Sequence, residues 1–435
     1  MPLALAAVLF FPFTSFAANV LPLTEQDSQK SIREFKDFKL TMARYHEANA
    51  EWGHACECYQ TLLTLDRDQP ELKKRFQFCF RQCNRKFRLG DASFVPTILQ
   101  PELRLSDSLD FYKDVARKIQ EAYVHTDKAN FTKLFQEGVE ELALDLEDPD
   151  FRKFLRPSLT DGDIQEFRAR LRQQWGAAKV ADLKETLKNV RTIALEAMRK
   201  LDLNPKLVVV EFACGACNAL DEYSFYLTQG GLSSLPDDKT GIEAEVLEKG
   251  IGHVRILSFD SSTIQHLETV LQQFKMNMVE VIVLDLRGNP GGNLEVAVQV
   301  VERFVPAPQP IASTSGKDPR SFNSGAGPMQ VVTGPLFVLV DNQTASAAEL
   351  VAGALKSHKR AELVGQNTYG KNLVQRMVPL SMAPYGAIHL TSSKFHLPKP
   401  DELSKPGGIA PTIAADAGKE LEVVLPRARA LVSMR

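Results

Sequence analysis

The sequence has little of several features that would place it in a specialised class of protein. Its 52 Lys and Arg nearly balance 54 Asp and Glu, so the net charge of −2 excludes the broad basic surface of a nucleic-acid-binding protein. Trp occurs only 2 times and Tyr 8 times, but 25 Phe and a hydrophobic content of 44 % supply ample material for a full core. With 24 % charged residues, this composition is that of a globular chain. It excludes a disordered chain, a collagen-like repeat and a polytopic membrane protein.

A long hydrophobic run is also lacking. The apolar stretch from Met1 to Phe16 is too short to span a bilayer comfortably. It is followed by Ala17-Ala18-Asn19, and a short apolar core before small residues predicts a secretory signal, segment 1–18, cut near Ala18. No Lys or Arg precedes the run, so a buried first helix or a misplaced start is the alternative. We therefore expect an exported protein, periplasmic or secreted, that contacts a membrane only through an uncleaved N-terminus.

The six cysteines are few and fall in local pairs. If the protein is exported, disulfides are permitted. His54 and Cys58 are four residues apart, as are Cys79 and Cys83, so two antiparallel helices could bring these four side chains together as zinc ligands. One disulfide is a second possibility, and small core thiols of a helical hairpin, Cys56 included, are the preferred one. Cys214-Gly-Ala-Cys217 has redox-motif spacing without thioredoxin-like surroundings, which favours packing.

The 435 residues predict two or three domains, or one large domain with an appendage, at roughly 150 residues per domain. Residues 19–90 are expected to form a helical hairpin, with helices near Tyr45–Leu65 and Pro70–Phe87, that weakly resembles one tetratricopeptide unit. It could bind a protein partner or simply cover the next domain. Asp91–Leu103 contains two prolines and is interpreted as a linker. Residues 106–202 show helical periodicity again.

Strands and helices alternate in the rest of the chain, which predicts an α/β domain over residues 206–420. The run Val279–Leu286 is continuous and β-branched, as in a buried parallel strand. Further strands are expected at Val254–Phe259, Pro335–Val340 and Ala361–Gly365. Helices are expected at Thr263–Phe274, Leu294–Phe304 and Ala345–His358. Loops between such strands and helices usually carry the chemistry of an α/β domain.

Three of these loops contain chemically suggestive residues. Ser346 lies where a helix begins, and the next N–H, that of Ala347, would be a free donor of the first helical turn, able to hold an oxyanion. Ser346-x-x-Glu349 is also a capping-box pattern, so a plain helix cap is the competing interpretation. Lys371 follows a glycine in a second turn. The third loop, Asp285-Leu-Arg-Gly-Asn-Pro-Gly-Gly292, lacks both the Walker pattern and the G-x-G-x-x-G spacing.

Taken together, VIVLDLRGNPGG, VLVDNQTASAAE and VGQNTYGKNLVQ closely resemble the motifs of the carboxy-terminal processing (tail-specific) serine peptidases. The resemblance implies a crotonase-like (ClpP-like) catalytic core, here with an all-helical region before it. It implies that Ser346 is the nucleophile, Lys371 the general base and Gln375 the residue that holds the lysine. It also implies that the backbone N–H groups of Ala347 and Gly292 stabilise the oxyanion.

Two further segments carry the resemblance and two features depart from it. Gly407-Gly-Ile-Ala-Pro411 resembles the terminal G-I-x-P element, and Ala219–Ser224 resembles the LDPYS stretch, with Glu222 in place of Pro. Asn372 stands where the family has Gly. Only about thirty residues separate Leu227 from Val254, too few for the PDZ module that the family usually carries there. Either that module is lost, or Gly241–Val246 is its remnant.

The chemistry that the resemblance implies needs neither a histidine nor a metal or organic cofactor. A neutral lysine can activate a serine hydroxyl if burial lowers its pKa from ~10.4 towards ~7–8. We therefore predict a serine endopeptidase that cleaves unfolded or processed exported polypeptides through an acyl-enzyme. A non-catalytic ligand- or protein-binding module on the same core is the alternative.

Overall fold

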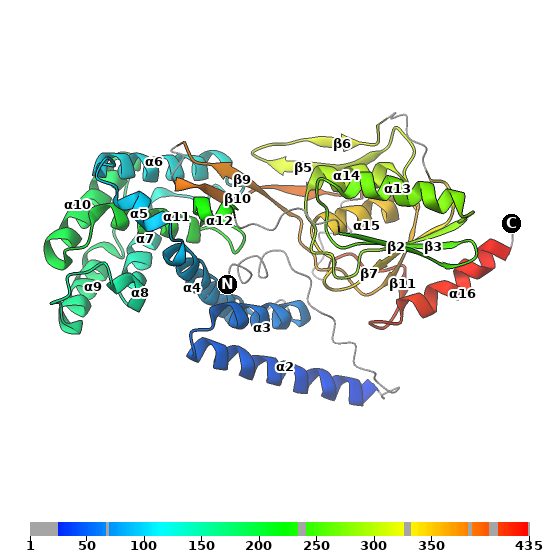
Figure 1. The fold of residues 1–435 in the computed structure, drawn as a ribbon, viewed down its shortest axis with the longest axis horizontal. Coiled ribbons are helices and arrows are strands. Elements are labelled where there is room, and N and C mark those ends of the chain that lie inside the picture. The colour runs from blue at the N-terminus through cyan, green and yellow to red at the C-terminus, as the bar shows by residue number, and fades with distance from the viewer. Residues whose placement is uncertain are drawn as a thin grey trace.

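The computed structural model describes residues 25–66, 69–233, 241–325, 332–381, 385–399 and 408–433. The expected signal segment 1–18 lies outside the described residues, as does Gly407. Within the described ranges, no helix combines the length and the apolar character needed to cross a bilayer. An all-helical part forms one end of the molecule and an α/β part the other, and an antiparallel sheet lies between them (Figure 1).

The chain begins with three helices, α2 (Glu25–Ala48), α3 (Trp52–Leu65) and α4 (Pro70–Gly90). The prediction of a two-helix hairpin is therefore incomplete, because the unit has three helices. Ala50, with a φ of 54°, lies in the turn that separates α2 from α3. We call α2–α4 the N-terminal helical unit. Its core includes four unbonded, buried thiols, those of Cys56, Cys58, Cys79 and Cys83. The side chain of His54 is 67 % exposed and faces Glu57 instead of the thiols, so the structure agrees with core packing over zinc or a disulfide.

The second helical group has its own core. It comprises α5 (Phe94–Leu99), α6 (Leu105–Ala122), α7 (Phe131–Asp145), α8 (Pro149–Arg152), α9 (Asp161–Trp175), α10 (Leu183–Leu201) and α11 (Pro205–Asn218). The interpretation of Asp91–Leu103 as a plain linker is wrong, because Pro96 lies in the first turn of α5, where a missing N–H costs no helical bond. Helix α11, with Cys214 and Cys217 buried in it, packs in this helical core. The α/β part therefore begins after α11 and not at residue 206.

A six-stranded sheet forms the α/β core, in the order β11-β8-β7-β4-β3-β2. Its strands are β2 (Ile242–Glu248), β3 (Ile251–Ile256), β4 (Val281–Asp285), β7 (Leu336–Val340), β8 (Glu362–Gly365) and β11 (Ile413–Ala414). All neighbours are parallel except β2 and β3. The strands predicted over Val279–Leu286, Pro335–Val340 and Ala361–Gly365 are confirmed, and the one expected at Val254–Phe259 lies slightly earlier.

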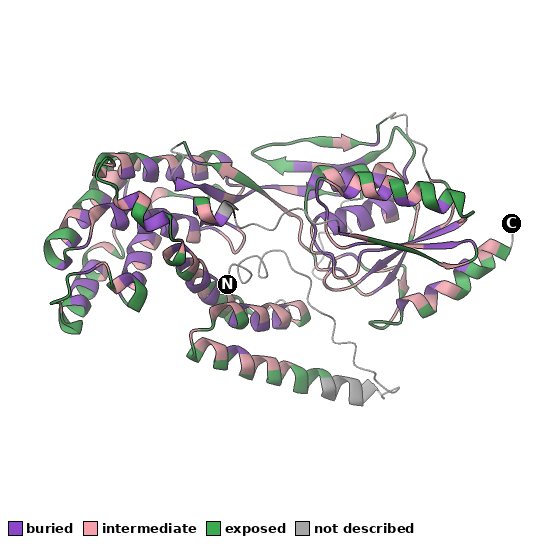
Figure 2. Ribbon diagram, in the orientation of Figure 1, coloured by how far each residue is buried: buried purple, intermediate pink, exposed green. Residues whose placement is uncertain are grey.

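Helices cover both faces of this sheet, which explains its continuous apolar strands. One set of alternating residues, such as Leu284 and Val338, packs with α13 (Thr263–Met276), α14 (Leu294–Glu302) and α15 (Ala347–Ser357). The other set, such as Val283 and Leu339, packs with α16 (Glu420–Ser433). Figure 2 shows the buried residues gathered in this sheet and, separately, among α6, α7 and α11.

A second sheet connects the two parts of the molecule. Its longest strand, β10 (Ala387–His396), pairs antiparallel with β1 (Phe225–Leu227), β5 (Pro310–Gly316) and β9 (Leu373–Pro379), and β6 (Ser321–Asn323) pairs with β5. The short helix α12 (Gln229–Ser233) follows β1. Gly241–Val246 is not a PDZ remnant: it contributes β2, the antiparallel edge strand of the core sheet.

Candidate active site

Three loops meet at the carboxyl ends of β4, β7 and β8. Asp341 accepts a hydrogen bond from Gly288 N at 3.0 Å, and Ala345 N donates to Asn289 O at 2.9 Å. Tyr369 N donates to Thr344 O at 2.8 Å. The Gly-rich turn, the Ser346 loop and the Lys371 loop are therefore neighbours, as the resemblance implied.

Ser346 precedes α15 in a backbone conformation that an ordinary cap does not adopt. Its φ and ψ are 55° and −117°, whereas N-cap residues are normally extended. A non-glycine residue with such a backbone costs about 1–3 kcal/mol, and strain of this kind is concentrated at functional sites. A Cβ at Gly291 would lie 2.9 Å from Ser346 Cβ and 3.0 Å from Ala347 N, so only glycine fits against the serine. The Gly-rich turn is thus shaped to pack on Ser346.

Two backbone N–H groups beside Ser346 are available to an oxyanion. The N–H of Ala347 opens α15 and has no helical acceptor. Gly292 follows the glycine that touches Ser346, and its turn is held by Phe259 N donating to Gly291 O at 3.0 Å and Asn293 N donating to Phe259 O at 2.8 Å. Within the described chain, neither Ala347 N nor Gly292 N has an acceptor. Both predicted oxyanion donors are therefore unoccupied, and Gly292 is also exposed.

Glu349 connects the serine to the lysine loop. Its buried carboxylate accepts from Ser346 N at 2.9 Å and from Lys371 N at 2.8 Å, both on the same oxygen, Oε2. Its other oxygen accepts from Gly370 N and from Thr368 Oγ1, each at 2.5 Å. Burial raises the pKa of Glu349 while these four donors oppose the rise. The sequence showed this residue only as half of a capping box, so its link to the Lys371 loop was missed.

Lys371 is partly buried, and its side chain lies over an aromatic ring. Its Nζ is 4.2 Å from the centre of the Tyr223 ring. Burial lowers the pKa of Lys371 from 10.5 to about 8, against an opposing effect of Asp221, Glu222 and Glu349. In the described residues, no hydrogen bond joins the amine of Lys371 to the hydroxyl of Ser346. The backbones of the two residues are therefore brought together, while the lysine side chain rests on Tyr223.

Gln375 does not hold Lys371 in this structure. It lies on β9, and its Nε2 donates to Thr391 Oγ1 of β10 at 3.3 Å. Thr391 N in turn donates to Ser224 Oγ at 3.1 Å. Gln375 thus connects β9, the strand after Lys371, through Thr391 to the loop that contains Tyr223.

The segment that resembles G-I-x-P braces the lysine loop from the other side. Thr368 N donates to Ile409 O at 3.1 Å, and Ile409 N donates to Thr368 Oγ1 at 2.8 Å. A Cβ at Gly408 would lie 2.3 Å from Thr368 O, so glycine is required at this close approach. The loop that presents Lys371 is therefore fixed at Thr368 both by Glu349 and by this segment.

The comparisons with known proteins match this part of the chain. Residues 250–415 match the family model of peptidase family S41. The chain contains a peptidase family S41 domain. A carboxy-terminal-processing protease of Bartonella bacilliformis aligns with 39 % of this chain and 40 % of its own length, and the aligned residues are 33 % identical. The carboxy-terminal processing protease CtpB of Bacillus subtilis aligns with 40 % of this chain and 35 % of its own length, at 34 % identity. The chain thus aligns with about two fifths or less of these relatives.

Among solved structures, a photosystem II D1 C-terminal processing protease aligns with 74 % of this chain and 97 % of its own, at 17 % identity and a TM-score of 0.42. The S41 domain of this protein contains all five residues that the motifs singled out: Ser346, Ala347, Gly292, Lys371 and Gln375. The helical part and the loop with Tyr223 lie before that domain. The predicted peptidase family and the α/β core with an N-terminal helical region are confirmed.

Outside the S41 domain, one set of residues in the described ranges has the spacing of a metal site. Glu141, Asp145 and Glu211 bring three buried carboxylates within ligand distance of one another. Arg85 donates to Glu141 Oε1 at 3.1 Å and pairs with Asp145, and Arg88 pairs with Glu211. Because guanidinium groups already pair with these carboxylates, we interpret the cluster as the ionic contact between α4 and the helices α7 and α11.

Proposed function

We propose that this protein is a serine endopeptidase of the carboxy-terminal processing type and that Ser346 and Lys371 form its catalytic dyad. The observation that carries the proposal is the arrangement around Ser346. A strained serine lies beside the N–H groups of Ala347 and Gly292, which have no acceptor in the described chain. Its own N–H and the N–H of Lys371, whose amine has a pKa of about 8, donate to the same carboxylate oxygen of Glu349. A capping box alone would explain the bond from Ser346 N to Glu349, but neither the strained backbone of Ser346 nor the bond from Lys371 N to the same carboxylate oxygen.

In the proposed mechanism, neutral Lys371 accepts the proton of the Ser346 hydroxyl as its oxygen attacks the scissile carbonyl. The lysine amine, which lies over the Tyr223 ring, must come within hydrogen-bonding distance of the Ser346 hydroxyl through a small change in its own flexible side chain. Catalytic hydrogen bonds are often long in the absence of substrate and shorten when it binds. Ala347 N–H and Gly292 N–H stabilise the oxyanion, and Lys371 returns the proton to the leaving amine. Water then hydrolyses the acyl-enzyme, and Gln375 acts only indirectly, through its bond to Thr391 beside the loop that contains Tyr223.

The substrates we propose are peptides and unfolded polypeptides outside the cytoplasm, in the periplasm or the extracellular space. The named relatives are processing proteases, which supports a peptide substrate. Their alignments cover only part of their length, so substrate choice is argued below from this chain's own residues.

Labelling with a fluorophosphonate probe tests the proposal directly. The probe should modify Ser346, as read by peptide mass mapping, and Lys371→Met should suppress the modification because the hydroxyl loses its base. Absence of label in the folded parent protein would contradict the dyad. It would favour the alternative, a binding module on the same core.

A further inference from the structure

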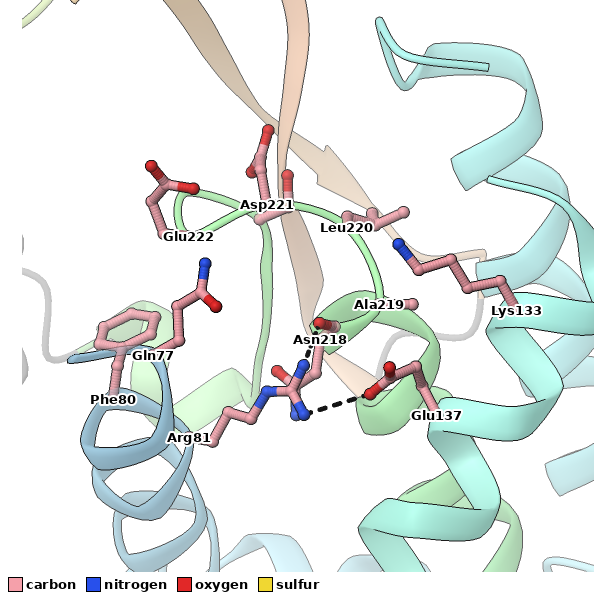
Figure 3. A pocket seen from close by; sticks show the side chains of 11 residues that line it. Gln77, Phe80, Arg81, Lys133, Glu137, Asn218, Ala219, Leu220, Asp221 and Glu222 are labelled. Atoms are coloured by element: carbon pink, nitrogen blue, oxygen red, sulfur yellow. Dashed lines mark hydrogen bonds and ion pairs between the residues drawn. The ribbon is translucent and has the colours of Figure 1, made fainter. Parts of the chain in front are cut away.

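The loop from Asn218 to Phe225 lies between the N-terminal helical unit and Lys371. On one side, the Tyr223 ring lies 4.2 Å beneath the amine of Lys371. On the other side, Asn218, Asp221 and Glu222 line a cavity of about 210 Å³ whose opposite wall includes Phe80 and Arg81 of α4 (Figure 3). The loop thus has the proposed base on one face and a separate structural unit on the other.

Two consecutive residues of α4 hold the two ends of this loop. At its start, Arg81 Nη2 donates to Asn218 O at 2.6 Å, while Nη1 donates to Glu137 of α7 at 3.2 Å (Figure 3). At its end, the Phe80 ring packs edge-on against the Phe225 ring, with centroids 5.6 Å apart. Phe225 belongs to the same apolar cluster as the thiols of the N-terminal helical unit. Displacing α4 would therefore release both ends together.

The centre of the loop is held to the strand beside it. His389 of β10 shares a hydrogen bond with Tyr223 O, with 2.8 Å between Nδ1 and the oxygen, and its ring lies 4.9 Å from that of Phe225. Tyr123 donates to Asp221 Oδ2 at 3.3 Å. Contacts therefore run without interruption from Phe80 through Phe225 and His389 to the backbone of Tyr223. The position of the tyrosine ring depends on all of them.

We propose that Tyr223 positions the amine of Lys371 and that Phe80 and Arg81 of the N-terminal helical unit position Tyr223. This inference rests on the proposed function of Lys371 as the general base. The aromatic face attracts the ammonium form and limits the space that the side chain can explore. A loop with few anchoring contacts opens locally, so losing the anchors would let water reach the amine. The N-terminal helical unit is then part of the catalytic assembly and more than a cover or a docking surface.

Several titratable groups face the amine and must be considered in any pH measurement. Asp221 and Glu222 come from the loop, Glu349 from α15 and His389 from β10. The carboxylates favour protonated Lys371, and burial opposes them. Opening of the loop would hydrate the amine and move its pKa up towards the ordinary value. The ionisation of Lys371 therefore reports on the loop without any need for turnover.

The test uses two matched pairs of variants in the full chain. Arg81→Met removes the guanidinium that reaches the loop, and Arg75→Met removes another paired arginine of α4, whose partner Glu47 lies within the N-terminal helical unit. Tyr223→Leu removes the ring, and Tyr223→Phe keeps it. For each, kcat and KM are measured on an unfolded protein substrate. The pH midpoint of Lys371 acylation by an amine-reactive ester is followed by peptide mass mapping.

We expect Arg81→Met and Tyr223→Leu to lower kcat by about tenfold or more with little change in KM. Each change misplaces the proposed base but leaves the substrate-binding residues in position. Tyr223→Phe should restore the activity lost in Tyr223→Leu, and Arg75→Met should behave like the parent. The acylation midpoint of Lys371 should rise in Arg81→Met and stay in place in Arg75→Met. If Arg81→Met fails to fold, Arg81→Lys replaces it, since an ammonium cannot bridge Asn218 and Glu137 as the guanidinium does.

Equal kcat and equal acylation midpoints in Arg81→Met and Arg75→Met would overturn the inference, as would a Tyr223→Phe variant no more active than Tyr223→Leu. Failure of the proposed function would look different, because the parent protein would then resist the fluorophosphonate probe. The acylation midpoints would still decide whether α4 controls the surroundings of Lys371.

Discussion

At the scale of single residues, the proposed chemistry depends on one serine that the fold holds under strain. Ser346 has a positive φ, and Gly291 packs against its Cβ where no larger residue fits. Strain of this kind persists only where surrounding contacts over-determine it. Here Glu349, Gly291 and the start of α15 provide those contacts, so the hydroxyl can be presented beside the N–H groups of Ala347 and Gly292, which have no acceptor among the described residues.

We predict that Ser346→Ala abolishes peptidase activity with little change in stability, because the hydroxyl serves catalysis and not the helix. Turnover of an unfolded protein substrate and thermal unfolding together check this. Thr160→Ala is the matched control, since Thr160 caps α9 with its side chain accepting from Asp163 N at 3.2 Å. The control should lose about 0.5–2 kcal/mol of stability and keep its activity.

The reverse pattern would disprove the nucleophile assignment. If Ser346→Ala cleaves at the parental rate and unfolds as Thr160→Ala does, Ser346 is a cap. Thermal denaturation of the two variants, measured side by side in one buffer, distinguishes the two roles.

The depressed pKa of Lys371 predicts the pH dependence of the reaction. The base works only when neutral, so kcat/KM of the parent should rise with pH and level off above a midpoint close to 8. A pH–rate profile on an uncharged peptide substrate measures this midpoint. A flat profile between pH 6 and 9 would contradict a lysine base, because a group with a pKa of about 8 changes its charge within that interval.

The same shift makes a prediction about stability. The folded pKa of Lys371 is about 8, below the ordinary 10.5, so between these values the unfolded chain binds more protons than the folded one. Stability of the parent should therefore rise with pH across that window. Lys371→Met, which buries no charge, should be more stable than the parent at pH 7 and lose this advantage as the pH rises. Thermal unfolding at several pH values tests it, and a constant difference would refute it.

At the scale of elements, Glu349 joins the first turn of α15 to the loop before β9. We predict that Glu349→Gln lowers kcat by at least about tenfold and destabilises the protein by about 1–3 kcal/mol, because an amide leaves backbone N–H donors without acceptors. Glu362→Gln is the control, because Glu362 is the exposed residue of β8. This variant should change neither kcat nor the free energy of unfolding. Activity and chemical denaturation measure both effects. An active, stable Glu349→Gln would show that the link is dispensable.

Elements with strong local patterns could be predicted from the sequence, and those that depend on distant partners could not. Apolar runs such as Val279–Leu286 and the helix after Ser346 were predicted because burial on both sides dictates their composition. Helix α5 was missed because Pro96 suggests a linker, although its first turn tolerates proline. At the site, motif resemblance pointed to Ser346 and Lys371, and their assignment as a dyad stays a prediction. The contacts of Lys371 with Tyr223, and of Gln375 with Thr391, join segments far apart in sequence, and no local pattern records them.

At the scale of the whole molecule, the helical and α/β parts meet through β10 and through the loop under Lys371. β10 pairs with β1 beside the helical core and with β5 in the α/β part. Phe225 of β1 packs with the N-terminal helical unit. The proposed site is therefore built from residues of the S41 domain together with residues that precede it. Substrate selection must be considered for this whole assembly.

The last prediction concerns the end of the substrate. Between β1 and β3, the described residues form α12 and the edge strand β2, and they contain no sheet of the kind that clamps a terminal carboxylate. We propose that selection then depends on the surface between the Gly-rich turn and the Lys371 loop, where an extended peptide could bind through its backbone. We expect two peptides of one sequence, one with a free C-terminus and one amidated, to be cleaved at an internal bond with similar kcat/KM. If amidation lowers kcat/KM by about tenfold, then about 1.4 kcal/mol of transition-state binding comes from the carboxylate, and a site for it exists elsewhere in this assembly. Lys133, whose side chain points into the cavity beside the Tyr223 loop, would be the first residue to replace in that case (Figure 3).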